Sequence, residues 1–159
     1  MIAADRLVID ASVAVKWVLP EPGAERAGVL LSALASGDLA IEIPDICVAE
    51  ITNVLWKRCR RRDELTPRQA RQAQALLLDV LPVPTPSAQL VPAALEIALT
   101  YRHSVYDCLY VALAERRNCP LVTADRPLVR SMEPATVEVI HLEQIWDSDE
   151  DGALGGPAR

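Results

Sequence analysis

Residues 7–12 read LVIDAS, a short, continuous apolar run that ends at an acid. A run of this length without alternating polar residues is typical of a strand buried on both faces, as in a parallel sheet. Helical spacing follows from Ser12 to Leu19, and Pro20 and Pro22 end it. A buried strand followed directly by a helix predicts an α/β domain.

Strands and helices continue to alternate along the rest of the chain. Strands are predicted at 39–43, 83–86, 121–123 and 137–141, and helices at 25–36, 45–61, 66–78, 87–101, 104–117 and 126–132. Because helical crossovers connect parallel strands, we expect a three-layer α/β/α sandwich with a central parallel sheet. This domain is expected to occupy residues 1–146, and the acidic, Gly-rich residues 147–159 are expected to be a disordered tail.

The composition is that of an ordinary globular domain. Hydrophobic residues make up 51% of the 159 residues and charged residues 24%, a balance that excludes a disordered chain. No apolar run is long enough to cross a membrane, and the first residues lack the basic and apolar segments of a secretory signal. We therefore expect a cytoplasmic protein that does not associate with membranes.

The cysteines and the net charge limit the kinds of metal site and of nucleic-acid binding that the chain can support. The four cysteines, at positions 47, 59, 108 and 119, include no closely spaced pair, which argues against zinc and redox sites. Cys47 and Cys108 lie in apolar helical stretches and are predicted to be core residues. The formal net charge is −6, so binding to nucleic acid requires metal cations or a local basic patch.

Four acids stand at positions where the local pattern alone leaves two explanations open. Asp10 and Asp125 each follow a buried strand and precede a helix, so each is either a helix N-cap or a ligand-binding group at the carboxyl edge of the sheet. Glu50 lies on a largely apolar helix face, as either a boundary residue that reaches solvent or a site residue. Asp107 follows Ser104 by three residues, as either part of a capping box or a site residue.

The four acids together predict a site that none of them predicts alone. Two stand at strand ends and two on helices expected to pack beside those strands, so the fold can bring all four to one edge of the sheet. Carboxylates gathered in one pocket repel each other, and hard divalent cations relieve the repulsion. Ligation by oxygen alone favours Mg²⁺ or Mn²⁺ over zinc. Such a site lowers the pKa of a bound water and neutralises charge on a phosphate, which is the chemistry of a metal-dependent nuclease.

Four blocks of the sequence resemble a known family. They are VIDASVAVKW at residues 8–17, PDICVAEITNVL at 44–55, YDCLYVALA at 106–114 and LVTAD at 121–125. In this order they resemble the PIN-domain family, and within it the VapC branch, the toxins of bacterial and archaeal toxin–antitoxin pairs. The resemblance extends from Leu7 to Leu142, and the chain departs from it at Leu128, where related toxins often carry an aromatic residue.

The resemblance implies a PIN-like fold and a Mg²⁺- or Mn²⁺-dependent endoribonuclease that hydrolyses RNA phosphodiester bonds with a metal-activated water. It also implies a homodimer that is inhibited by a VapB-type antitoxin. By position, the family's catalytic and metal-binding acids fall on Asp10, Glu50, Asp107 and Asp125. Supporting polar positions around them fall on Ser12, Asn53 and Thr123.

A basic segment near the middle of the chain offers contacts for RNA phosphates. Its proposed RNA-binding residues are Lys57, Arg58, Arg60 and Arg61, and the alternative is a solvated helix end whose cations suit the helix dipole.

Two other functions compete with the ribonuclease. One is a non-catalytic PIN-like module that binds RNA or protein, which the presence of all four acids disfavours. The other is a phosphotransfer domain with Asp10 as nucleophile, which Ser12 disfavours because such enzymes usually carry a second aspartate at that position.

Overall fold

The computed structural model describes residues 4–61, 64–133 and 135–146. The strands are β1 (Arg6–Ile9), β2 (Ala40–Glu42), β3 (Leu121–Thr123) and β4 (Val139–His141). The α-helices are α1 (Ala11–Ala14), α2 (Ala24–Ser36), α3 (Ile46–Arg60), α4 (Pro67–Val80), α5 (Val91–Tyr101), α6 (Val105–Arg117) and α7 (Arg126–Ser131). Three short 3₁₀ helices are η1 (Val15–Trp17), η2 (Ser87–Gln89) and η3 (Leu142–Trp146). The tail predicted at 147–159 lies outside the described residues.

The four strands form one parallel sheet in the order β2-β1-β3-β4. Val8 pairs with Leu121 and Ile9 with Val122, so β1 and β3 end side by side. Because β2 and β3 flank β1 on opposite sides, the strand order reverses at β1. In open α/β sheets, ligands bind beside the carboxyl ends of the strands at such a reversal. The fold therefore places the residues that follow β1 and β3 at a ligand-binding position.

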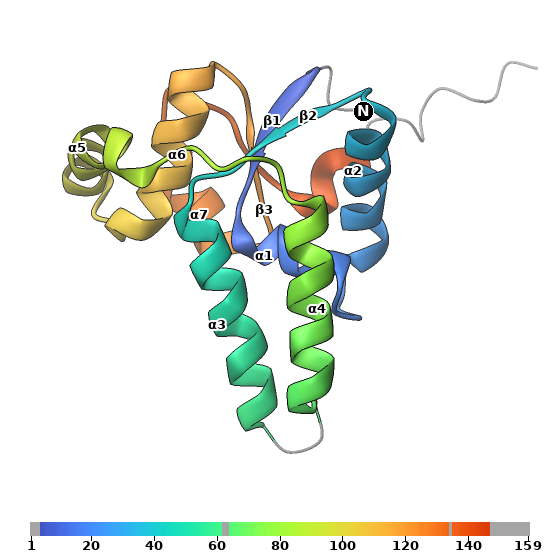
Figure 1. The fold of residues 1–159 in the computed structure, drawn as a ribbon. Coiled ribbons are helices and arrows are strands. Elements are labelled where there is room, and N and C mark those ends of the chain that lie inside the picture. Colours follow the sequence, from blue (N-terminus) through green and yellow to red (C-terminus); the bar gives the residue numbers. More distant parts are fainter. Residues whose placement is uncertain (1–3, 62–63, 134, 147–159) are drawn as a thin grey trace, which may run out of the picture.

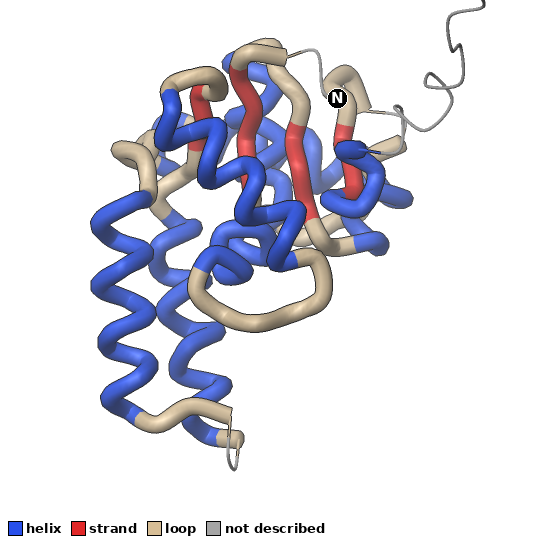
Figure 2. The backbone as a smooth tube through the Cα atoms, turned by 90° about the vertical axis from the view of Figure 1, so that its right-hand side faces the viewer, coloured by secondary structure: helices blue, strands red, loops and turns tan. Residues whose placement is uncertain are grey.

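Helices cover both faces of the sheet. In Figure 1, α5 and α6 lie on one side of the strands and α2 lies on the other. This arrangement confirms the predicted three-layer α/β/α sandwich. The view in Figure 2, turned by 90°, shows the strands side by side behind a covering layer of helix.

Two long helices, α3 and α4, pack against each other and extend beyond the sheet (Figure 1). The inner face of α3 is apolar, with Cys47, Ile51 and Leu55 buried at four-residue spacing. Thr66 begins α4 with a capping box, in which its hydroxyl accepts from the Gln69 backbone N–H and the Gln69 side chain accepts from the Thr66 N–H. These local signals explain why both helix positions could be predicted from the sequence.

The core is centred on β1, β3 and α6. Every residue from Cys108 to Ala114 in α6 is buried, and Val8 and Val122 in the sheet are fully buried. Cys47 and Cys108 are also fully buried, which confirms that they are core residues. None of the helices in the described ranges is both long and apolar enough to span a membrane.

The strand predicted at 83–86 is wrong. Only Thr85 makes strand-like contacts there: its N–H donates to the Ile43 carbonyl at 2.9 Å, and its carbonyl accepts from the Asp45 N–H at 2.9 Å. The prolines at positions 82, 84 and 86 have no N–H to donate, so the pairing cannot extend beyond a single bridge. The helix predicted at 87–101 is likewise divided, into η2 and α5.

Candidate active site

Asp10 follows β1 and is held on both carboxylate oxygens. Its Oδ1 atom accepts hydrogen bonds from the Ser12 hydroxyl at 2.6 Å and from the Val13 backbone N–H at 3.1 Å. Its Oδ2 atom accepts from the Thr123 hydroxyl at 2.5 Å. Asp10 is therefore the N-cap of α1, as one of the two explanations predicted, and its carboxylate is also tied to the neighbouring strand.

The hydroxyls of Ser12 and Thr123 connect the ends of β1 and β3. Besides donating to Asp10, Ser12 Oγ accepts from the Ala124 N–H at 2.9 Å, and Thr123 Oγ1 accepts from the Asp125 N–H at 2.9 Å. Each hydroxyl thus links the Asp10 carboxylate, which follows β1, to a backbone amide that follows β3. The structure places both of these predicted supporting residues against Asp10.

Asp125 lies immediately beyond this bridge and is the N-cap of α7. Its Oδ1 atom accepts from the Leu128 N–H at 3.4 Å. The capping bond holds one oxygen at the helix end, and the bridge through Thr123 fixes the Asp125 backbone relative to Asp10. Both acids at strand ends are thus helix caps, and they lie at the carboxyl edge of the sheet, where open α/β sheets bind ligands.

Glu50, in the second turn of α3, reaches the same region. The buried hydroxyl of Tyr110, on α6, donates to Glu50 Oε2 at 2.5 Å. Partial burial raises the pKa of Glu50 above its ordinary value, the Tyr110 hydrogen bond opposes that rise, and repulsion from Asp107 and Asp10 adds to it.

Asp107 lies in the first turn of α6. Its Oδ2 atom is 3.1 Å from His103 Nε2. Burial raises the pKa of Asp107, His103 opposes the rise, and repulsion from Asp125 adds to it. Ser104 caps α6 through the Tyr106 N–H, so the capping box proposed for Asp107 is not formed.

The four acids form one electrostatically coupled group. Repulsion from Asp10 and Asp107 raises the pKa of Glu50, and repulsion from Asp125 raises the pKa of Asp107. Asp10 has a raised pKa as well, because its burial outweighs the hydrogen bonds that favour its charged form. The structure therefore brings the four acids, which are up to 115 positions apart in the sequence, to the same edge of the sheet.

The donor chemistry of this group fits a hard divalent cation. The acids supply oxygen ligands alone, and their repulsion favours binding of positive charge. As placed, however, no three His, Cys, Asp or Glu side chains in the described ranges converge closely enough to chelate one ion. Mg²⁺ keeps several of its waters and is commonly held by one or two carboxylates, so a hydrated ion does not need that convergence.

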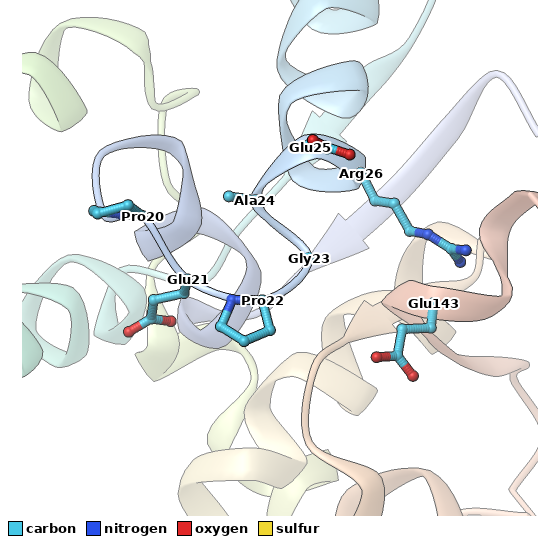
Figure 3. A pocket seen from close by; sticks show the side chains of 8 residues that line it. All are labelled: Pro20, Glu21, Pro22, Gly23, Ala24, Glu25, Arg26 and Glu143. Carbon is cyan, nitrogen blue, oxygen red and sulfur yellow. The ribbon is translucent and has the colours of Figure 1, made fainter.

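Two cavities share the turn at Pro22 and Gly23, and one of them borders the site. One, of about 760 Å³, lies between the turn before α2 and η3, and its wall carries Glu21, Glu25 and Glu143 against Arg26 (Figure 3). This surplus of acids makes it a poor site for RNA phosphates. The other cavity, of about 420 Å³, has Asp125 in its wall.

The basic segment at the end of α3 divides into paired and exposed cations. Arg58 forms ion pairs with Glu21 and Glu64, and Arg61 lies 3.7 Å from Glu64. Lys57 and Arg60 are exposed. Asn53 is also exposed, and among the described residues no hydrogen bond joins its side chain to the four acids.

Two side chains at the site were not predicted from the sequence, namely Tyr110 and His103. His103 stands four residues before Asp107 and Tyr110 stands three residues after it, spacings that place all three on one helical face when the helix is extended to His103. That signal locates Tyr110 and His103 beside Asp107. It does not reveal the contact of Tyr110 with Glu50, because that contact joins residues 60 positions apart.

The comparisons with known proteins agree on one family. The PIN domain family model matches residues 7–131. Ribonuclease VapC3 of Pyrobaculum aerophilum is 31% identical over 134 residues, which cover 83% of this chain and 98% of the relative. Ribonuclease VapC1 of Mycobacterium tuberculosis is 34% identical over 127 residues, which cover 78% of this chain and 89% of the relative.

Solved structures share the fold. The crystal structure of PAE2754 from Pyrobaculum aerophilum has a TM-score of 0.63 at 20% identity and covers 87% of this chain and 84% of its own. The crystal structure of FitAcB from Neisseria gonorrhoeae has a TM-score of 0.55 at 18% identity, with coverages of 87% and 99%. At these identities the likeness shows the fold alone.

Proposed function

This chain belongs to the PIN-domain family, and we propose that it is a divalent-metal-dependent endoribonuclease, the toxin of a VapC-type toxin–antitoxin pair. The observation that carries the proposal is the coupled group of four carboxyls at the strand reversal. Among the described residues, no Lys or Arg forms an ion pair with any of the four acids, so gathering them destabilises the fold unless a ligand supplies positive charge.

The four acids have different roles in the proposed reaction. Asp10, Asp107 and Asp125 would hold a hydrated Mg²⁺ or Mn²⁺, directly or through its water ligands, and Glu50 would bind through water or orient the attacking water. When bound, the cation lowers the pKa of a water and neutralises charge on the scissile phosphate. Ser12 and Thr123 keep Asp10 oriented through the hydrogen bonds described above.

RNA would reach the site along α3. Lys57 follows Glu50 by seven residues, or about two helical turns, so it lies on the same face at roughly 10 Å along the axis. Arg60 lies one turn farther and is also exposed. Arg58 and Arg61 contribute less free charge to phosphates, because acids already pair with them.

The proposed partners are a VapB-type antitoxin and a second copy of the chain. The names of the relatives support the first proposal. The second is supported by a row of exposed apolar side chains along α5, formed by Val91, Leu95 and Leu99. Sedimentation of the purified protein measures the mass of the assembly, and a monomer at micromolar concentration would refute the homodimer.

The ribonuclease is tested by cleavage of a panel of small structured RNAs with Mg²⁺ or Mn²⁺. Wild type is expected to cleave, and Asp10→Asn is expected to lose activity by about 100-fold or more, because it weakens the metal site. Asp79→Asn, at an exposed position on α4, is the matched control and should retain activity.

The competing function is a non-catalytic PIN-like module that binds RNA or protein. Equal cleavage by wild type and Asp10→Asn, or no cleavage with either metal, would favour that module. Expression of the intact chain alone offers a second test, because a toxin should arrest bacterial growth while Asp10→Asn at equal protein level should not.

A further inference from the structure

We propose that Tyr110 is a positioning residue that aims the carboxylate of Glu50 at the metal-binding edge of the sheet. The inference rests on the proposed function and adds to it a residue outside the acidic quartet. It is carried by a hydrogen bond between two helices, α6 and α3, in which the Tyr110 hydroxyl donates to Glu50 Oε2 at 2.5 Å.

Glu50 differs from Asp10 and Asp125 in how it is held. Asp10 and Asp125 accept backbone N–H groups as helix N-caps. Glu50 lies inside a helix, where the backbone N–H groups are already used, so a side chain must orient it. Among the described residues, Tyr110 is the hydrogen-bond partner of Glu50, and no hydrogen bond holds Oε1.

The hydrogen bond from Tyr110 keeps Glu50 in the site against repulsion from the other acids. Asp10 and Asp107 both push the Glu50 carboxylate away. Glu50 is only partly buried and its side chain has several rotatable bonds, so without a donor it can turn toward solvent and leave the group. A hydrogen bond from a neutral hydroxyl to a carboxylate is among the stronger kinds, and it holds Oε2 while leaving Oε1 available.

Tyr110 is itself rigidly placed. It is 1% exposed, and α6 is buried on both sides of it. It stands three residues after Asp107, so one face of α6 supplies an acid of the site and the donor that aligns another acid. Cys47 and Glu50 flank the hydroxyl from α3, where they lie three residues apart. This environment fixes the direction of the hydroxyl and, through it, the carboxylate.

The test is the variant Tyr110→Phe, which removes one oxygen and keeps the ring. Tyr106→Phe is the matched control, because Tyr106 lies on the same helix, is 63% exposed and has no side-chain hydrogen bond to Glu50 among the described residues. Calorimetric titration of the full-length, RNA-free proteins with Mn²⁺ measures the dissociation constant. We expect Tyr110→Phe to bind Mn²⁺ about tenfold more weakly, the lower end of the usual effect of removing a group that orients a metal ligand. Tyr106→Phe should match wild type.

A double-mutant cycle shows whether the effect passes through Glu50. In a Glu50→Gln background, Tyr110→Phe should cause little further loss of Mn²⁺ affinity, because the carboxylate it aligns is gone. Tyr110→Phe that binds Mn²⁺ as tightly as wild type would overturn the inference. So would the same tenfold loss in both backgrounds, since that result would place the effect of Tyr110 elsewhere.

A metal-free measurement separates this inference from the proposed function. The buried hydroxyl proton of Tyr110 should give a downfield proton NMR resonance in wild type that moves upfield in Glu50→Gln, because a neutral amide is a weaker acceptor. If this resonance is absent, or if it does not move in Glu50→Gln, the hydrogen bond is refuted even if the enzyme is active. If wild type binds no Mn²⁺ while the resonance behaves as expected, the metal-dependent function and the metal-positioning role both fail, and only the hydrogen bond stands.

Discussion

Replacing Thr123 by valine should loosen the junction between β1 and β3 on which the site depends. Thr123 is fully buried, and its hydroxyl donates to Asp10 Oδ2 at 2.5 Å while accepting from the Asp125 N–H at 2.9 Å. Valine has the same shape and lacks the hydroxyl, so the substitution removes both hydrogen bonds and leaves the packing volume unchanged.

The magnitude follows from those two bonds. The bond to the carboxylate contributes about 1.5–3 kcal/mol and the bond from the amide about 1 kcal/mol, and the added methyl group offsets at most about 0.8 kcal/mol. The expected loss of unfolding free energy is therefore about 2–3 kcal/mol, which corresponds to a fall in Tm of roughly 5–10 °C for a domain of this size.

Urea unfolding of the metal-free protein measures this loss, with Thr123→Ser as the control. Serine keeps the hydroxyl and lacks one methyl group, so it should cost about 1 kcal/mol. The bridge would be refuted as a stabilising element by Thr123→Val within about 0.5 kcal/mol of wild type, or by a serine variant less stable than the valine variant.

Three further predictions concern charge in the site. Without metal, Glu50→Gln and Asp107→Asn should each retain or raise the unfolding free energy, by up to about 1 kcal/mol, because repulsion is removed; a marked loss for both in urea titrations would indicate that these acids are structural. Asp10, Glu50 and Asp107 have raised pKa values in the folded state, so the folded protein keeps protons that the unfolded chain has already released. The unfolding free energy of the metal-free protein should therefore fall as the pH rises from the ordinary pKa values of 3.8 for Asp and 4.5 for Glu through the raised pKa values of the folded state. Urea midpoints that rise over this range would contradict the assignment. Mn²⁺ at about 100 times its Kd should stabilise wild type by about 2.7 kcal/mol at neutral pH, and equal stabilisation of Asp10→Asn would place the ion elsewhere.

The architecture could be predicted from local signals because those signals are strong in this chain. The apolar run before Asp10, and the Thr66 cap followed by Pro67, each define an element without reference to the rest of the fold. The strand predicted at 83–86 does not form, because the alternating prolines lack the N–H groups that a strand needs to pair with its neighbour.

The sequence predicts where the four acids lie in the fold better than it predicts the side chains that surround them. Asp10 and Asp125 could be placed because the end of a buried strand can be recognised in a sequence, and ligands bind at that edge of the sheet. Tyr110, which donates a hydrogen bond to Glu50, lies 60 positions later in the sequence. This contact depends on how α3 and α6 pack, which the sequence does not reveal. The pairing of Arg58 with Glu21 was missed for the same reason, since the acid lies 37 positions earlier in a turn.

The claim on which the rest depends is that Asp10, Glu50, Asp107 and Asp125 share a hard cation. A crystal of the full-length protein grown with Mn²⁺, measured for anomalous scattering at the manganese edge, tests it directly. The account predicts a manganese peak about 2.2 Å from carboxylate oxygens of at least two of the four acids, with Asp10 among them. Ordered density for all four side chains with manganese bound only at other surfaces would contradict it.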